Sequence, residues 1–470
     1  MRVAFAAAEA APYAKVGGLA DVAGSLPQAL ARLGCEVTLY LPLHGTIDRA
    51  KWMINDGPER SVIYGASHVR VAYPSVERDG VRVVFVANRR IGRDTIYGAP
   101  DDAKRYAFFC RAVVTALAQH KQDEPDAVDV VHAHDWHTAL LVPMIVRRSA
   151  SVFTIHNLAY QGKTSADVLA PVGLSKSRLP VEKAGECNPM ARAIARADIV
   201  SMVSPRYASE ILTPEFGEGL DGVLQQRKAD VRGIVNGIDT VAFDPARDPH
   251  IAARYSADEQ RGKAECKAAL QSEGGLRVDA ETPLLGVIGR LVEQKGVDLL
   301  TAVAPDLLEG GAQIAVLGTG DPAYEERWRK LRERYPSRLF LTLGFDAALA
   351  QRIYAGCDLF LMPSRFEPCG LGQLISLRYG TIPVVRAVGG LADTVRDLDE
   401  HPRDGNGFSF TQYDRTSFSG ALARALRAFR RGGDAWVALR TRAMREDHSW
   451  GPSASRYLDL YTAAQKRHRA

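Results

Sequence analysis

One short segment carries the clearest signal of the fold of this chain: Leu284-Leu285-Gly286-Val287-Ile288-Gly289-Arg290-Leu291-Val292-Glu293-Gln294-Lys295-Gly296. Its first five residues form an apolar run, which predicts a buried β-strand. A loop that begins and ends with glycine and carries charged side chains follows at once. A strand that is apolar on both faces is typical of a parallel sheet with helices on each side. The segment therefore predicts that a doubly wound α/β domain opens at about Pro283.

The same pattern recurs along the chain, where short apolar runs alternate with longer helical patterns. In the first half we predict strands at 3–8, 36–41, 81–86, 128–133, 151–155, 199–203 and 231–235. In the second half we predict them at 284–288, 313–317, 339–343, 359–362 and 383–386. Buried strands separated by helices indicate α/β architecture, and here it appears twice. We expect two Rossmann-like, doubly wound domains that face one another across a cleft, with ligands at the carboxyl ends of the strands.

The boundary between these domains is predicted near Asn236-Gly237-Ile238-Asp239, where a turn signal follows a strand. The last segment, 453–470, has a helical pattern, and such a tail often crosses back to the first domain in two-domain proteins of this shape. We therefore expect a first domain at 1–240, joined by the helix 453–470, and a second domain at 241–452.

Composition excludes several classes of function. The 470 residues are 46% hydrophobic and 24% charged, with a net charge of +5, as in an ordinary globular protein. Basic residues form no cluster with interleaved aromatic residues, so we expect no nucleic-acid partner. No apolar run is long enough to cross a membrane, so we expect no membrane partner.

The cysteines and the first residues of the chain indicate the cellular compartment of the protein. The six cysteines are scattered and form no C-x-x-C pair, which suits a reducing compartment. The apolar run after Met1 meets Glu9 too early for a secretory signal and is better explained as a buried strand. We expect a cytoplasmic protein.

A glycine-containing loop follows the first predicted strand. It reads Lys15-Val16-Gly17-Gly18-Leu19, and a helix is predicted at 21–33. Free amides at the start of that helix favour an anion, and Lys15 adds a full charge. The alternative is an ordinary glycine turn with a solvated lysine. The loop matches neither a P-loop nor G-x-G-x-x-G, so it carries no nucleotide fingerprint.

Two polar clusters follow later strands of the first domain. The first is His132-Ala133-His134-Asp135-Trp136-His137; it has no metal-ligand spacing, so core or capping histidines are the expected outcome. We expect Asp135 and Trp136 to line a sugar pocket, because carboxylates bind hydroxyls and aromatic rings cover C–H surfaces. The second cluster places His156 and Asn157 after the strand at 151–155, where both side chains suit sugar hydroxyls.

The second domain carries the cations. Arg290 and Lys295 stand five residues apart in the loop after a buried strand, and together they suit a diphosphate. The alternative is two exposed, unrelated charges.

The next motif, Pro363-Ser364-Arg365-Phe366-Glu367-Pro368-Cys369-Gly370-Leu371-Gly372-Gln373, opens a helix after another strand. We expect the amides of Cys369 to Gly372 to bind an anion. We expect Glu367 to accept hydrogen bonds from a sugar, with a capping glutamate as the alternative. The only D-x-D, Asp397-Leu398-Asp399, lies in a polar loop and is interpreted as incidental, so we expect no metal.

These segments, in this order, resemble the bacterial glycogen and plant starch synthases from Met1 to about Tyr461. Lys15 to Asp21 matches the family's K-[TV]-G-G-L-x-D signature. Five further blocks match, at 132–137, 155–162, 236–239, 290–296 and 364–371. The resemblance implies the GT-B fold and a retaining transfer of glucose from ADP-glucose to the non-reducing end of an α-1,4-glucan such as glycogen, with no cofactor.

The resemblance also implies roles for individual residues. Glu367 resembles the glutamate that holds the donor glucose, and Arg290 with Lys295 resembles the diphosphate clamp. The family's sugar-side catalytic residues match at Asp135 and His156, and its closing loop at the distal phosphate matches at Lys15, Gly17 and Gly18. Asp21 is implied as a further substrate-binding residue. Trp136, Asn157, Phe345, Cys369, Gly370, Leu371 and Gly372 are implied as substrate-binding residues, with Phe345 stacking on the base.

One departure from the family pattern concerns Gly372, which stands where relatives often carry threonine or asparagine. A hydroxyl contact to phosphate is then missing.

Three other functions remain open on the sequence. A second retaining GT-B enzyme, using a UDP-sugar and another acceptor, carries similar motifs. Glycogen phosphorylase also acts on α-glucan, but it needs pyridoxal phosphate and a longer chain. A non-catalytic glucan-binding protein would not need all four of Lys15, Arg290, Lys295 and Glu367. The sequence makes no prediction of the oligomeric state.

Overall fold

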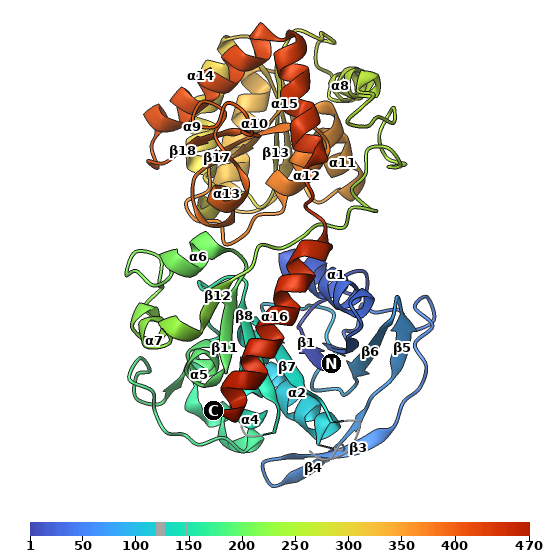
Figure 1. Cartoon of the computed structure of the whole chain (residues 1–470), viewed down its shortest axis with the longest axis vertical. Coiled ribbons are helices and arrows are strands. Elements are labelled where there is room, and N and C mark those ends of the chain that lie inside the picture. Colours follow the sequence, from blue (N-terminus) through green and yellow to red (C-terminus); the bar gives the residue numbers. More distant parts are fainter. Residues whose placement is uncertain (119–126, 146–147) are drawn as a thin grey trace. The chain divides into compact units, whose positions relative to one another are not determined.

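The computed structural model describes residues 1–118, 127–145 and 148–470 of the chain, which divides into two compact units (Figure 1). Unit 1 comprises Met1–Gly237 and Trp450–Ala470, and unit 2 comprises Ile238–Ser449. The boundaries expected from the sequence, after 240 and after 452, lie three residues beyond each of these junctions (240 − 237 and 452 − 449).

Unit 1 is built on an eight-stranded sheet in the order β12-β11-β8-β7-β1-β2-β6-β5. All neighbouring strands are parallel except the edge strand β5, which is antiparallel to β6. A separate hairpin pairs β3 with β4, and a short ribbon pairs β9 with β10. The strands are β1 (Arg2–Ala6), β2 (Glu36–Pro42), β3 (Glu59–Tyr64), β4 (Ser67–Ala72), β5 (Ser75–Arg78), β6 (Val81–Val86), β7 (Val130–His134), β8 (Ala150–Ile155), β9 (Thr164–Ser165), β10 (Glu186–Cys187), β11 (Ile199–Met202) and β12 (Val231–Gly233).

Helices cover both faces of this sheet. Side chains alternate between the faces along a strand, and Val3, Phe5, Val37 and Leu39 point into a core that α1 and α16 complete. Figure 1 shows α16 lying beside α1. The helix α2 packs against the hairpin strand β3 and against β6. The helices of unit 1 are α1 (Gly18–Arg32), α2 (Asp102–Leu117), α3 (Asp135–Ala139), α4 (Leu141–Ile145), α5 (Pro189–Arg196), α6 (Pro205–Glu210), α7 (Asp221–Gln226) and α16 (Trp450–Arg469).

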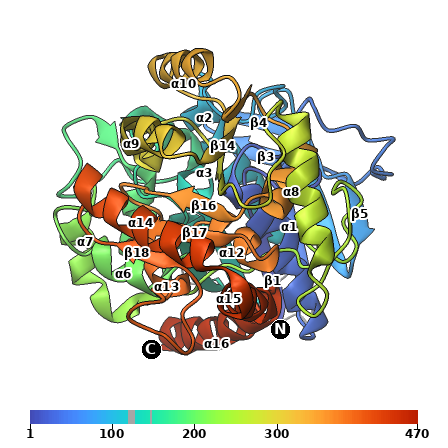
Figure 2. The same ribbon diagram turned by 90° about the horizontal axis from the view of Figure 1, so that it is seen from above.

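Unit 2 has a six-stranded, wholly parallel sheet in the order β15-β14-β13-β16-β17-β18. Its strands are β13 (Leu284–Ile288), β14 (Gln313–Gly318), β15 (Leu339–Leu343), β16 (Leu359–Met362), β17 (Ile382–Arg386) and β18 (Phe408–Phe410). In Figure 2, α9 and α14 lie on one side of this sheet and α8 and α12 on the other. The helices are α8 (Arg261–Glu273), α9 (Val297–Glu309), α10 (Pro322–Arg334), α11 (Ala347–Gly356), α12 (Gly372–Arg378), α13 (Gly389–Thr394), α14 (Arg415–Arg431) and α15 (Gly433–Arg445).

Both sheets reverse their strand order once, and these reversals position the functional loops. In unit 1 the order reverses between β1 and β7, and in unit 2 it reverses between β13 and β16. Ligands of open α/β sheets bind at the carboxyl ends of the strands where the order reverses. The loops after these four strands contain Lys15, Asp135, Arg290 and Glu367, so the motifs found in the sequence stand where the topology favours a site.

The described part of the chain contains no helix that is both long enough and apolar enough to span a membrane. All six cysteines are buried, and none of them forms a disulfide.

Candidate active site

A buried carboxylate lies at the centre of the unit 2 site. Glu367 is only 5% exposed, in the loop after β16. Lys295 Nζ lies 2.6 Å from Glu367 Oε2, and the Ser364 hydroxyl donates to the same oxygen at 3.1 Å. The Lys295 side chain keeps 27% of its surface exposed, so the ammonium is held by the carboxylate and still reaches solvent. The pair places a positive and a negative group side by side at the carboxyl ends of β13 and β16.

Close packing of two loops fixes this pair. Gly296 has a φ of +70°, and a Cβ there would lie 2.1 Å from the Pro363 carbonyl oxygen. A side chain at this position would therefore separate the loops. Arg365 N donates to the Gln294 carbonyl at 2.9 Å and links the same two segments. The glycine at the end of the cation motif thus brings Lys295 within reach of Glu367.

A second glycine pair supports the Glu367 loop from α13. Gly390 N donates to the Glu367 carbonyl at 3.1 Å. A Cβ on Gly389 would lie 2.0 Å from the Glu367 carbonyl oxygen, and one on Gly390 would lie 2.1 Å from that of Cys369. Sequence analysis missed this pair; the signal was a Gly-Gly step separated by two residues from the end of the strand β17.

Arg290 and Phe345 stand apart from the buried pair. Arg290 is exposed, and its Nη2 donates to Gln294 Oε1 at 3.1 Å. Phe345 follows β15 and is 83% exposed, so its ring presents an open apolar face. The predicted diphosphate clamp is thus made of one exposed arginine and one lysine held by Glu367.

The segment Cys369 to Gly372 forms a tight turn before α12. Gly370 has a φ of +74°, and its neighbour Gln373 is fully buried and donates to the Cys369 and Gly370 carbonyls at 3.0 Å each. A Cβ on Gly372 would lie 2.9 Å from the Phe360 ring. The departure from the family pattern at this position therefore has a packing reason, since Phe360 fills the space beside it.

In unit 1 the Lys15 loop is held by a residue that the sequence analysis did not assign. Glu9 is buried, and its Oε2 accepts from Val16 N at 2.5 Å and from Gly17 N at 3.0 Å. These two amides belong to the loop before α1, so the expectation of free amides at the start of the helix stays a prediction. Burial raises the pKa of Glu9, while those two amides and the Tyr97 hydroxyl oppose the shift.

Lys15 is itself paired, and the helix behind it starts earlier than predicted. Lys15 Nζ lies 2.6 Å from Asp21 Oδ1, and both side chains are partly exposed. The helix α1 begins at Gly18 and not at Asp21. Asp21 therefore lies in the first turn of α1, where a carboxylate is favourable and also positions the Lys15 ammonium.

Asp135 adopts a strained backbone at the end of β7. Its φ is +54°, which is uncommon for a residue other than glycine and typical of functional positions. Its Oδ1 accepts from His156 N at 2.7 Å and from Asn157 N at 3.4 Å, so it links the loops after β7 and β8. Burial raises the pKa of Asp135 to about 7, although both amides lower it; the nearby Glu9 adds to the rise. The carboxyl group is therefore poised to change charge near neutrality.

His156 is a neutral hydrogen-bonding group. Burial lowers the pKa of His156 to about 3. Its Nε2 lies 2.9 Å from His134 Nδ1, and the buried His134 Nε2 has no partner in the described part of the chain. Buried N–H groups without a partner are rarer than buried acceptors without one. We therefore leave His134 Nε2 as an acceptor without a proton and place the proton of the hydrogen bond on His134 Nδ1. His156 Nε2 accepts that proton, so the other ring nitrogen of His156, Nδ1, carries a hydrogen and can donate.

Trp136 is half-buried and packs beside other aromatic rings. Its ring centroid lies 4.1 Å from that of His137 and 5.5 Å from that of Tyr106. Gly162, at a φ of +68°, lets the chain approach the ring, since a Cβ there would lie 2.3 Å from it. Asn157 Oδ1 accepts from Ala159 N at 3.1 Å, so the Asn157 side chain shapes its own loop.

The other histidines of the cluster belong to the core. His132 and His134 are fully buried, and both rings contact Phe5. His132 Nδ1 lies 2.8 Å from the Tyr461 hydroxyl, which ties β7 to α16. Among the described residues no group of His, Cys, Asp and Glu is arranged to hold a metal ion.

The D-x-D sequence is occupied by a basic side chain. Arg424 Nη1 lies 2.7 Å from Asp397 Oδ1 and 2.9 Å from Asp399 Oδ2. Asp397 Oδ2 also accepts from Ser409 N at 2.6 Å. These carboxylates therefore serve to fix a loop.

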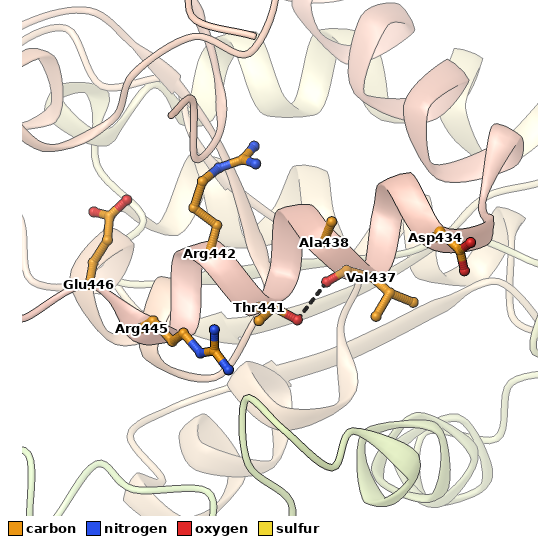
Figure 3. Close-up of a pocket in the computed structure, with 7 residues that line it drawn as sticks. All are labelled: Asp434, Val437, Ala438, Thr441, Arg442, Arg445 and Glu446. Carbon is orange, nitrogen blue, oxygen red and sulfur yellow. Dashed lines mark hydrogen bonds between the residues drawn. The ribbon is translucent and has the colours of Figure 1, made fainter. Parts of the chain in front are cut away.

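A solvent-open hollow of about 620 Å³ lies along α15 in unit 2 (Figure 3). Its lining comes from the exposed side of α15 and the residue after it. None of the residues predicted from the sequence lines it; those that do are Asp434, Val437, Ala438, Thr441, Arg442, Arg445 and Glu446.

Known proteins match this chain over both units. The family model of the starch synthase catalytic domain matches residues 2–226, and that of group 1 glycosyl transferases matches residues 272–428. A glycogen synthase of Moorella thermoacetica is 42% identical over 100% of this chain and 98% of its own length. A glycogen synthase of Anaeromyxobacter dehalogenans is 46% identical over 98% of this chain and 99% of its own.

Solved structures agree with the sequence matches. The catalytic domain of starch synthase IV from Arabidopsis thaliana, solved with ADP and acarbose, is 35% identical and has a TM-score of 0.89, with 99% of both chains covered. A sucrose-phosphate synthase from Thermosynechococcus elongatus is 19% identical with a TM-score of 0.63 and shares the fold. This chain therefore has the GT-B fold of two Rossmann-like domains and belongs to the glycogen and starch synthase family of glycosyltransferases.

Proposed function

We propose that this chain transfers glucose from ADP-glucose to the non-reducing end of an α-1,4-glucan such as glycogen, with retention of the α configuration. One observation carries the proposal: the Glu367 carboxylate is buried at the carboxyl end of β16 with Lys295 Nζ 2.6 Å away. A buried carboxylate suits sugar hydroxyls, and the lysine beside it suits the phosphate attached to that sugar.

The leaving group explains the need for the cations. Breaking the bond between glucose and the nucleotide leaves negative charge on the diphosphate. Fixed positive groups stabilise that charge more in the transition state than in the ground state. We assign this role to Arg290, as a bidentate donor, and to Lys295, as a point charge. With these two groups in place we propose that no cofactor takes part.

Unit 1 supplies groups suited to sugar hydroxyls. His156 is neutral because burial lowers its pKa to about 3, so it donates from Nδ1 without adding charge. Asp135 lies beside it and accepts its backbone amide at 2.7 Å. We assign these two residues to the sugar-side chemistry and the Lys15 loop to the distal phosphate. Trp136 is assigned to the glucan.

Relatives support the choice of substrates. The proteins from Moorella and Anaeromyxobacter are named glycogen synthases, and the Arabidopsis structure contains ADP. We therefore favour an adenine nucleotide over a uracil nucleotide for the donor. The six cysteines are buried and form no disulfide, which suits a reducing compartment, so we place the reaction in the cytoplasm.

The test is incorporation of labelled glucose into glycogen from ADP-glucose and from UDP-glucose. We expect turnover with ADP-glucose only when glycogen is present, and slower turnover with UDP-glucose. An α-1,4-specific amylase should release the added glucose, as retention requires. Turnover with UDP-glucose and a small acceptor, but not with glycogen, would favour the other GT-B enzyme.

A matched pair of variants assigns the chemistry to the site. Glu367→Gln keeps the shape of the side chain and removes its charge, and it should lower kcat by two or more orders of magnitude. The control is Glu326→Gln on α10, where the carboxylate is 52% exposed and joins only surface ion pairs. Equal activity in the two variants would refute the role of Glu367.

A further inference from the structure

A second hollow, of about 310 Å³ and lined largely by polar side chains, lies in unit 1 near the amino-terminal ends of β1, β2 and β6. Its lining includes Arg2 and Glu36, which begin β1 and β2, and Arg82 near the start of β6. The Lys15 loop and Asp135, by contrast, follow the carboxyl ends of β1 and β7. The hollow is therefore separate from the site described above.

The polar lining is specific to one face of the sheet. Thr38 pairs with Arg82 across β2 and β6, and Tyr40 follows on the same face of β2. The residues that alternate with them along β2, Val37 and Leu39, point to the other face and belong to the apolar core. A doubly wound sheet is normally apolar on both faces, so a polar patch here needs an explanation other than packing.

Arginines dominate the charge of this hollow. Arg82 is 3.8 Å from the exposed Glu77, and Arg2 is 3.2 Å from Glu36, whose side chain is 77% exposed. Arg60, from the hairpin strand β3, has no ion pair with a carboxylate among the described residues. The lining residues thus carry three guanidinium groups against the single carboxylate of Glu36.

A hydroxyl group completes the set of donors. Tyr40 is buried, and burial raises its pKa to about 12, although Arg82 and Arg60 oppose the shift. Its phenol therefore keeps its proton and stays a donor, with two arginines close enough to influence it. Such a set of donors is suited to an anion with several acceptor oxygens.

We propose that this hollow binds a small phosphate monoester, with Arg60 and Arg82 holding the phosphate group. A guanidinium binds phosphate through two parallel hydrogen bonds, and arginine is preferred at such sites. The volume lies at the lower end of the range for small-molecule sites, which suits a ligand of a few carbons. The hydroxyls of Thr38 and Tyr40 contact the remainder of the ligand. The proposal goes beyond the transfer reaction, since the hollow lies at the other ends of the unit 1 strands from the Lys15 loop and Asp135.

Calorimetric titration of the full-length protein tests this proposal with two probes, glycerol 3-phosphate and inorganic phosphate. Arg60→Gln/Arg82→Gln should weaken glycerol 3-phosphate binding at least tenfold, which equals about 1.4 kcal/mol. Arg70→Gln is the matched control, because Arg70 lies on the same hairpin with its side chain 87% exposed and is not part of the lining. It should bind as the unmodified chain does. Free phosphate binding more weakly than the ester would favour the ester as the ligand.

A second variant separates this hollow from the proposed donor site. Arg290→Gln should leave glycerol 3-phosphate binding intact. Loss of binding in Arg290→Gln together with normal binding in Arg60→Gln/Arg82→Gln would overturn the proposal, as would a lack of heat with either probe at millimolar concentration. Circular dichroism and glucosyl transfer without the probe report whether the double variant is folded, and both should match the unmodified chain.

Discussion

At the scale of single residues, the most informative contact is the one between Lys295 and Glu367. Removing one partner of a buried ion pair leaves an uncompensated charge, which costs more than removing both partners. Glu367 is 5% exposed, whereas the Lys295 side chain is 27% exposed. The carboxylate therefore depends on the lysine for its stability as well as for its position.

This dependence predicts different outcomes for stability and for catalysis. Lys295→Met should lower the unfolding free energy of unit 2 by about 2 kcal/mol and abolish transfer. Adding Glu367→Gln should restore most of the stability and none of the activity. Urea denaturation and labelled-glucose incorporation measure the two effects. If the double variant were less stable than Lys295→Met, the pair would not be coupled as described.

A second residue-scale prediction concerns the charge of Asp135. Its pKa is raised to about 7 by burial, from 3.8, so the folded chain holds this proton where the unfolded chain has lost it. Protonation of Asp135 therefore adds to the unfolding free energy at low pH. This contribution to stability falls as the pH rises from about 4 to about 7. Asp135→Asn cannot titrate. Its stability relative to the unmodified chain should therefore rise with pH, by at most about 1.4 kcal/mol per unit.

Urea denaturation of both proteins at several pH values between about 5 and 8 provides the measurement for Asp135. The neighbouring His156 has a pKa lowered to about 3, so its contribution is lost as the pH falls. That contribution is present in both proteins and cancels in the difference. If the unfolding free energies of the two proteins differed by the same amount at every pH in this range, the raised pKa of Asp135 would be contradicted.

Sequence reasoning found most charged groups of the site and missed how they are held. Glu9 was used only as evidence against a signal peptide, yet it accepts two amides of the Lys15 loop. Its signal was a lone acid at the end of a buried strand. The contact between Lys295 and Glu367 was not predictable, because it depends on two loops that are 72 residues apart in the sequence.

At the scale of elements, sequence predicted the strands that read as a mostly apolar run. The bounds predicted for β6, β13, β15 and β16 agree with the structure to the residue. The edge strands β5 and β18 and the hairpin of β3 and β4 were not predicted. The strands Glu59–Tyr64, Ser67–Ala72 and Ser75–Arg78 contain exposed polar residues, and Phe408–Phe410 has only three residues, so none of them gives the apolar run on which the prediction depends.

Helix ends in unit 2 depend on one buried lysine. Lys263 of α8 donates to the carbonyls of Ala355 and Tyr379, at the ends of α11 and α12, and to the Thr381 hydroxyl, at 2.8 to 3.0 Å. Helix ends leave carbonyls without partners in the helix, and a cation there also suits the helix dipole. Lys263 therefore joins three helices at one point.

Lys263→Met should lower the unfolding free energy of unit 2 by about 3 kcal/mol, because three acceptors lose their donor. Burial lowers the pKa of Lys263 to about 7 from 10.5, so the unfolded chain binds the extra proton between these values. The contribution of Lys263 to the unfolding free energy should therefore rise with pH over that window. The difference in unfolding free energy between the unmodified chain and Lys263→Met should widen accordingly. Denaturation at pH values of about 7 and 9 measures it; a constant difference would contradict the lowered pKa.

At the scale of the whole molecule, the chain leaves unit 1 after Gly237, builds unit 2 and returns at Trp450. The returning helix α16 places Trp450, Tyr457, Leu460 and Tyr461 in the core of unit 1. At about 2 kcal/mol for each large buried side chain, these four contribute about 8 kcal/mol, which is comparable with the total stability of a typical domain. Unit 1 is thus discontinuous in sequence, and unit 2 is continuous.

This connectivity predicts that the two units behave differently when they are separated. Residues 238–449, expressed alone, should fold and unfold cooperatively, and they should bind ADP, since Arg290, Lys295 and Glu367 all lie within them. Residues 1–237 without 450–470 should fail to fold. Thermal denaturation and calorimetric titration with ADP are the measurements, and Arg290→Gln in the isolated unit 2 is the control for specific binding. Isolated unit 2 that folds but does not bind ADP would show that unit 1 contributes groups essential for nucleotide affinity, against the assignment of the diphosphate to Arg290 and Lys295.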